Sequence, residues 1–163
     1  MKTIPLTKGR VAFVDEADYE RVRKLHWWCT QTYPGGTFYC LANVGSRRER
    51  KFLYLHRFIL GVAPDQEVDH RDCNGLNNTR ANLRLCSSGQ NKGNMRLPSH
   101  NKSGFKGVSL TPDGYWRAQL QHKKERKHIG LFPTAQDAAR AYDERALIAF
   151  GEFARTNKSM GLL

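Results

Sequence analysis

The chain lacks the paired cysteines of a zinc ribbon and the long apolar run of a membrane span. Its four cysteines form no Cys-x-x-Cys pair; they are Cys29, Cys40, Cys73 and Cys86. The start of the chain has no apolar stretch of the kind that a signal peptide needs. We therefore expect a protein of the host cell cytoplasm, with no membrane contact and with free thiols in place of disulfides.

Acidic residues are scarce relative to basic ones. The 163 residues include 27 Lys and Arg against 15 Asp and Glu, which gives a net charge of +12. Residues 1–91 carry +5 of this excess and residues 92–163 carry +7. Such an excess favours a polyanionic partner, because Lys and Arg that contact phosphates release counterions. A basic but inert surface is the alternative.

The chain is long enough for two small domains, and its loop-forming residues indicate where they meet. Residues 97–103 are polar and aperiodic, which predicts a linker. We expect one domain over residues 1–96, a second over residues 104–157 and a tail over residues 158–163. Each domain would have a thin core, because small domains bury a smaller fraction of their chain.

The local patterns predict a mixed α+β fold. Before the linker we expect a short strand, a helix that begins after Asp15, and two strands around a turn at Pro34-Gly35-Gly36. After the linker, three strand-like runs precede a helix capped by Thr134; the runs are residues 105–110, 115–122 and 126–132. These patterns predict a three-stranded antiparallel sheet packed on one helix.

The densest polar chemistry lies between residues 67 and 91. Asp69 and His70 follow an apolar residue, and Asn82 and Asn91 come later in the same stretch. We expect two antiparallel strands here, followed by a helix that begins at Ser87 or Ser88 and carries Asn91. A plain polar turn with a helix-capping asparagine is the alternative for any one of these residues.

The order of these residues resembles the HNH homing endonucleases of phages and mobile elements, which have a ββα-metal or His-Me finger site. The resemblance covers most of residues 1–95. It is carried by Leu55-His56-Arg57, Val68-Asp69-His70, Asn77-Asn78, Ala81-Asn82-Leu83-Arg84-Leu85 and Gln90-Asn91. We interpret Asn77 and Asn78 as turn residues. Three arginines are candidates for phosphate contact or for simple solvation, namely Arg71, Arg80 and Arg84.

The resemblance also implies roles for individual residues. His70 would be the general base that takes a proton from the attacking water. Asp69 and Asn91 would bind one divalent metal ion, Mg²⁺ or Mn²⁺, and Asn82 would orient His70 through a hydrogen bond. His56 is a candidate to support the site, and packing at a helix face is its equal alternative.

Residues 103–157 resemble the ethylene-response-factor (apetala-two) DNA-binding domain, in which a three-stranded sheet enters the major groove. The matching positions imply DNA contacts by Lys106, Trp116, Arg117, Gln119 and Lys127. Ser109 and Thr111 stand where plant members tend to carry arginines, so the base preference should differ. Core packing is the alternative for Trp116, and a solvated hairpin tip is the alternative for Lys123, Lys124 and Lys127.

Together these features predict a metal-dependent homing-type endonuclease that cuts double-stranded DNA as a monomer or weak dimer. A non-catalytic, sequence-specific DNA-binding regulator is the alternative. The four-residue set of Asp69, His70, Asn82 and Asn91 argues against it, because a scaffold has no need of metal-ligand chemistry. An RNA-binding protein is disfavoured, because the chain has no aromatic pair of the RNP type.

Overall fold

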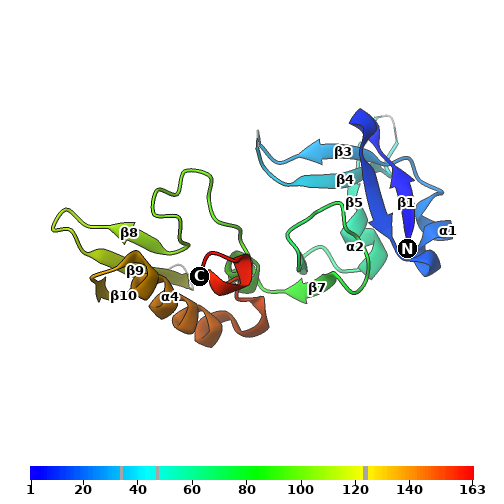
Figure 1. The fold of residues 1–163 in the computed structure, drawn as a ribbon. Helices are drawn as coiled ribbons and strands as arrows, with labels where there is room; N and C mark the ends of the chain where they lie inside the picture. The colour runs from blue at the N-terminus through cyan, green and yellow to red at the C-terminus, as the bar shows by residue number, and fades with distance from the viewer. Residues whose placement is uncertain (34, 47, 123–124) are drawn as a thin grey trace. The chain divides into compact units, whose positions relative to one another are not determined.

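The structure, a computed structural model, describes residues 1–33, 35–46, 48–122 and 125–163 (Figure 1). The chain folds into two compact units, Met1–Cys86 (unit 1) and Ser87–Leu163 (unit 2). Both units mix helices and strands, as the sequence predicts. No helix in the described ranges is long and apolar enough to cross a membrane. Pro34 of the first predicted turn, and Lys123 and Lys124 of the predicted hairpin tip, lie outside the described residues.

The described residues of unit 1 form three small antiparallel sheets and two helices. The sheets pair β1 (Lys2–Pro5) with β2 (Val11–Val14), β4 (Phe38–Asn43) with β3 (Trp28–Gln31) and β5 (Phe52–Tyr54), and β6 (Glu67–His70) with β7 (Leu83–Cys86). The helices are α1 (Glu16–Val22) and α2 (Leu55–Leu60), and a 3₁₀ turn spans Thr7–Gly9. The core gathers one apolar side chain or more from nearly every element, including Ile4, Val14, Val22, Leu55 and Ile59.

The helix α1 begins after Asp15, as predicted, but the Asp15 carboxylate does not cap it. That carboxylate instead accepts a hydrogen bond of 2.7 Å from the Arg80 backbone N–H. The Arg80 guanidinium donates to the buried Asp18 carboxylate at 2.8 and 2.9 Å, and Arg21 donates to it at 2.8 Å. The bond from Arg80 holds the pKa of Asp18 below its usual value. Arg80 therefore ties α1 to the segment before β7.

Unit 2 contains the predicted three-stranded antiparallel sheet, with β9 (Trp116–His122) between β8 (Val108–Leu110) and β10 (Glu125–Phe132). The long helix α4 (Ala135–Phe150) lies along one face of this sheet (Figure 1). The Thr134 side chain caps α4 by accepting from the Asp137 N–H at 3.1 Å, as its position predicts. Small buried residues let the helix approach the strands closely; they include Ala138, Ala139 and Ala146.

Unit 2 also contains α3 (Ser88–Gly93) and two 3₁₀ turns, Gly151–Phe153 and Lys158–Met160. The Ser87 hydroxyl accepts from the Gln90 N–H, and the Gln90 side chain accepts from the Ser87 N–H, which is a capping box. Gly93 is buried, and a Cβ added there would lie 2.7 Å from Cγ of Phe150. This close fit holds α3 against the end of α4, so α3 belongs to unit 2. The boundary between the two units therefore lies between Cys86 and Ser87, before the linker that the sequence predicts at residues 97–103.

Candidate functional site

The predicted site residues of unit 1 lie at the end of β6. Asp69 and His70 are 4% and 5% exposed. They pair in register with Arg84 and Leu83 of β7. Successive residues of a strand point to opposite faces, so Asp69 and His70 are both buried but have different surroundings.

Asp69 is paired with Arg84. Nε and Nη2 of Arg84 each lie 2.8 Å from Oδ2 of Asp69, and both side chains are less than a tenth exposed. A buried carboxylate is costly unless an opposite charge and hydrogen bonds compensate it. The two alternatives proposed for Arg84, phosphate contact and simple solvation, are therefore wrong for this structure, because the guanidinium is buried against Asp69.

His70 contacts a buried amide. Its Nε2 lies 3.4 Å from Oδ1 of Asn78, which is fully buried and donates from Nδ2 to the Gly75 carbonyl at 3.2 Å. Because the Asn78 oxygen can only accept, a hydrogen bond at this contact requires the proton on Nε2. Burial lowers the pKa of His70, and the contact with Asn78 opposes that shift. Burial therefore favours the neutral form of the ring.

Asn78 was interpreted from the sequence as a turn residue, and that interpretation missed its place beside His70. Asn82 was predicted to make this hydrogen bond and does not. The Asn82 side chain donates to Oδ1 of Asp72 at 2.9 Å and to the Asn77 carbonyl at 2.8 Å. It also accepts from the Asp72 N–H at 3.1 Å. Asn82 therefore shapes the loop between β6 and β7, and Asn78 contacts the imidazole.

His56 lies on α2 and faces His70. The two ring centroids are 5.0 Å apart at a near-perpendicular angle, and His56 is 9% exposed. Among the described residues its Nδ1 is buried without a hydrogen-bond partner. Burial lowers the pKa of His56 to about 3. The structure therefore places a second neutral imidazole beside His70.

Asn91, the second predicted metal ligand, lies on α3 in unit 2. No group of three or more His, Cys, Asp or Glu side chains that could hold a metal occurs within the described ranges. A carboxylate and an amide oxygen are nevertheless donors of the type that Mg²⁺ and Mn²⁺ prefer. Asp69 and Asn91 each carry an oxygen donor of this type, and in this structure the Asp69 carboxylate is paired with Arg84.

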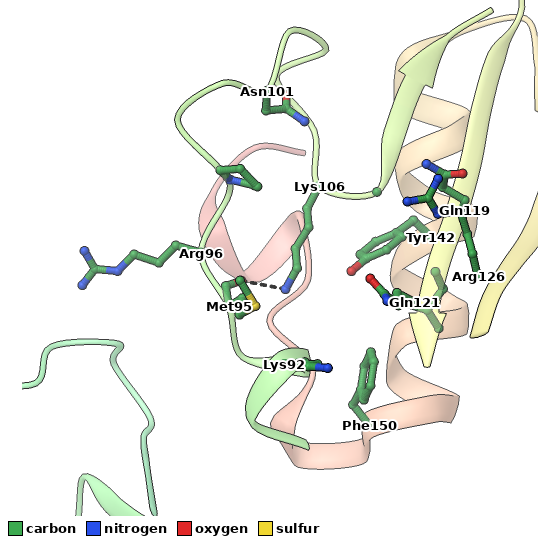
Figure 2. A pocket seen from close by; sticks show the side chains of 13 residues that line it. Lys92, Met95, Arg96, Asn101, Lys106, Gln119, Gln121, Arg126, Tyr142 and Phe150 are labelled. Atoms are coloured by element: carbon green, nitrogen blue, oxygen red, sulfur yellow. Dashed lines mark hydrogen bonds between the residues drawn. The ribbon is translucent and has the colours of Figure 1, made fainter. Parts of the chain in front are cut away.

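Lys106 was predicted to contact DNA, and its geometry contradicts that role. The side chain is 9% exposed, and Nζ donates to the carbonyls of Gly93, Met95 and Arg155 at 2.8, 2.7 and 3.1 Å. Figure 2 shows the ammonium turned toward the chain around Met95. An ammonium has three N–H donors, so these carbonyls use all of them. Lys106 anchors the segment after α3 to the rest of unit 2.

The other predicted DNA contacts divide between the two faces of the sheet. Ala118 and Leu120 are buried on the α4 side, and by register Trp116 and Lys127 point to that side too. Arg117 and Gln119 point to the opposite face. Arg117 is exposed and donates to the hydroxyl of Ser109 at 3.3 Å. Ser109 on β8 is its cross-strand partner. Two of the five predicted residues therefore share the outer face.

A cavity of about 330 Å³ opens at the edge of this sheet, beside Lys106 (Figure 2). Its lining includes Lys92, Arg126, Gln119 and Tyr142. The two cations and the amide suit an anionic group such as a phosphate. Arg126 pairs with Gln121 on β9, so by register it lies on the same outer face as Arg117.

The geometry thus defines a chain with a buried Asp-His pair in one unit and a helix-backed sheet in the other. An uncharacterised HNH endonuclease of Acanthamoeba polyphaga mimivirus is 34% identical to it over 152 residues, which cover 93% of this chain and 76% of the relative. The chain belongs to the HNH endonuclease family.

Part of the chain also resembles plant transcription factors. An ethylene-responsive transcription factor of Medicago truncatula is 36% identical over 84 residues, half of this chain and 31% of that protein. One of Arabidopsis thaliana is 46% identical over 59 residues, 35% of this chain and 23% of that protein. The chain thus spans less than a third of these two plant relatives. No family model and no solved structure matches it.

Proposed function

We propose that the protein is a metal-dependent, homing-type endonuclease that hydrolyses a phosphodiester of double-stranded DNA, with a ββα-metal site in the segment from β6 to α3. The observation that carries the proposal is the buried, neutral His70 at the end of β6, fixed by the Asn78 amide. The similarity to a named HNH endonuclease over 93% of the chain supports it.

His70 acts in this proposal as the general base. The ring, oriented by its contact with Asn78, accepts the proton of the attacking water. The lowered pKa of His70 favours the neutral imidazole, which is the form that can accept a proton. Asn78 is a positioning residue that fixes the ring orientation, and His56 packs against the ring at 5.0 Å and limits its rotation. Asn82 supports the same loop through Asp72.

Asp69 and Asn91 are the residues that we propose as ligands for one Mg²⁺ or Mn²⁺ ion. When bound, such an ion stabilises the charge that develops on the leaving 3′ oxygen. In the structure Arg84 neutralises the Asp69 carboxylate, which keeps a buried charge balanced.

The outer face of the unit 2 sheet is the surface that we propose for double-stranded DNA. Arg117 and Gln119 lie on it with Arg126, and β-strands fit the major groove. Residues 92–163 carry +7 of the net charge and residues 87–91 carry no charge, so unit 2 as a whole carries +7. The plant relatives are transcription factors, which agrees with a DNA-binding role for this part of the chain.

A non-catalytic DNA-binding regulator is the second candidate. The buried Asp69–Arg84 pair favours it, because an ion pair of this kind is also a structural element. The two candidates differ in one respect, which is metal-dependent cleavage.

The experiment incubates the full chain with supercoiled plasmid that carries the gene's own flanking DNA, with Mg²⁺, with Mn²⁺ and with EDTA. We expect nicked or linear product only with metal, and a loss of about 10²–10⁴-fold in rate for His70→Ala. His26→Ala is the matched control, because His26 is an exposed histidine of unit 1. Absence of cutting with every metal, while DNA is still bound, would select the regulator.

A further inference from the structure

The sheet β3–β4–β5 of unit 1 carries bulky rings on one face. Antiparallel register sets Trp28, Leu41 and Tyr54 side by side, and it sets Asn43 beside Phe52. Tyr39 is two residues before Leu41 on the same strand, so it shares this face. The other face carries the buried Cys29, Cys40 and Ala42. We refer to Trp28, Tyr39, Phe52 and Tyr54 as the ring face.

Two rings of the ring face, Tyr39 and Tyr54, contact the candidate catalytic base and its neighbour His56. Trp28 meets Phe52 edge-on at 5.8 Å, and Tyr39 meets Tyr54 at 6.0 Å. Tyr54 lies 5.3 Å from His56, and Tyr39 lies 5.8 Å from His70. The Tyr39–Tyr54 pair therefore reaches the imidazole that we propose as the base, and register places the Trp28–Phe52 pair on the same face, on the other side of Leu41.

Much of this aromatic area is open to solvent. Phe52 is 55% exposed and Tyr54 is 37% exposed, while Trp28 and Tyr39 are half-buried. Rings that served only as core would be covered, because burial is what makes an aromatic side chain stabilising. Large exposed apolar side chains gathered on one surface indicate a binding site.

The charge beside the ring face indicates the chemistry of its ligand. The connection from β4 to β5 carries Arg48, Arg50 and Lys51, all exposed, against Glu49, which pairs with Lys51 at 3.7 Å. Flat aromatic surface next to a basic loop is the combination that binds single-stranded nucleic acid, because bases stack on rings while cations follow the phosphates.

We propose that the ring face stacks unpaired bases of the DNA strand that is cut, next to the phosphate approached by His70. This inference rests on the proposed endonuclease function. Bases in an intact duplex are stacked on their neighbours, so only bases that have left the helix can lie on the rings. The enzyme accordingly favours DNA that is locally opened or distorted at the cleavage site.

The test uses the full chain in EDTA, where binding is measured without cleavage. A short single-stranded oligonucleotide and a duplex with a central bulge carry 2-aminopurine, whose emission reports stacking; a fully paired duplex is the reference. Phe52→Leu keeps an apolar side chain and removes the ring, and Phe52→Ala removes both. Tyr33→Ala is the control, because Tyr33 is 67% exposed in the same unit and is not among the ring contacts.

We expect each Phe52 variant to bind the single strand and the bulged duplex about tenfold more weakly, with a smaller change in 2-aminopurine emission. Tyr33→Ala and the fully paired duplex should be unaffected. Wild-type binding and emission for Phe52→Leu would overturn the inference, and would leave a protein partner as the occupant of the ring face. Plasmid cleavage is scored separately, so stacking without cleavage refutes only the endonuclease, and cleavage without stacking refutes only the ring face.

Discussion

His56 in unit 1 and Lys106 in unit 2 are buried to the same extent, at 9% exposed, but their surroundings are opposite. The Lys106 ammonium donates to three carbonyls at 2.7–3.1 Å. Among the described residues, the His56 Nδ1 has no partner. A buried polar atom without a partner costs stability, so it is retained where something other than stability is served.

The same contrast extends to the neighbours of these two residues. In unit 2, Asn157 is fully buried, donates to Asp143 and to the Lys106 carbonyl, and accepts from the Lys106 N–H at 2.6 Å. In unit 1, the His56 ring packs against His70, whose contact with Asn78 is long at 3.4 Å. The Asn157 network thus stabilises unit 2, whereas burial lowers the pKa of two adjacent imidazoles in unit 1.

A fall in pH should lower the stability of unit 1 more than that of unit 2, and this is the largest difference that we expect between them. The pKa of His56 is lowered from 6.5 to about 3 and that of His70 is lowered too, while the histidines of unit 2 are exposed or half-buried. Between pH 6.5 and 3 the unfolded chain binds protons that the folded unit 1 does not, so the stability of unit 1 falls as pH falls. The loss for His56 is at most about 4–5 kcal/mol.

Hydrogen exchange followed by mass spectrometry at pH 7 and pH 5 reads each unit separately. We expect exchange in unit 1 to accelerate on acidification beyond the intrinsic chemical rate, and expect His56→Gln to reduce that effect. His26→Gln should leave it unchanged. An equal acceleration of exchange in both units would contradict the expected difference in their pH dependence.

Asn157→Ala should cause the largest mutational loss of stability in unit 2, about 3 kcal/mol, because the N–H and carbonyl of Lys106 lose their partner inside the fold. Urea unfolding followed at Trp116 measures this loss in a background where Trp27 and Trp28 are replaced by Phe. Lys158→Ala, at the exposed neighbouring position, is the control. A loss below about 1 kcal/mol would show that the network is less important than its geometry indicates.

Lys106→Met should reduce the stability of unit 2 by about 2 kcal/mol, since three carbonyls lose a charged donor while the apolar stem is kept. Exchange should accelerate around residues 93–96. DNA affinity of the folded protein should not change. A lower affinity for DNA without faster hydrogen exchange would show that Lys106 contacts DNA, as the sequence predicts.

Arg117→Ala should have the smallest effect, about 1 kcal/mol in DNA binding, with no loss of stability. If Arg117 contacts a phosphate, the salt dependence of the binding constant should weaken by about one counterion. Arg140→Ala is the matched control, because Arg140 is an exposed arginine on α4. Equal effects of the two substitutions would place the DNA elsewhere.

The sequence predicted the elements of both units well where a local pattern determines them. The Thr134 cap, the alternating strands and the small residues of α4 require only neighbouring positions, and the predicted sheet on one helix was confirmed. The burial of Lys106 was missed, because its three carbonyl partners lie 13, 11 and 49 residues away along the chain. No local pattern encodes such a contact.

The candidate site shows the same limit. The resemblance to HNH endonucleases predicts roles for Asp69 and His70, but Asn78 and Asn82 were given each other's contacts. Both are asparagines in one loop, and only the path of the backbone decides which amide reaches the imidazole. The partner of Asp69 was missed likewise, because Arg84 meets it across the β6–β7 register.

We propose that unit 1 cuts DNA and that unit 2 binds it. The most direct test measures bound DNA and cut DNA in the same samples, for the wild-type chain, for His70→Ala and for the double variant Arg117→Ala, Arg126→Ala. The account predicts that His70→Ala binds as the wild type does and does not cut. It also predicts that the double variant binds more weakly, yet cuts at the wild-type rate once protein is in excess. Cutting by His70→Ala, or unchanged binding by the double variant, would contradict it.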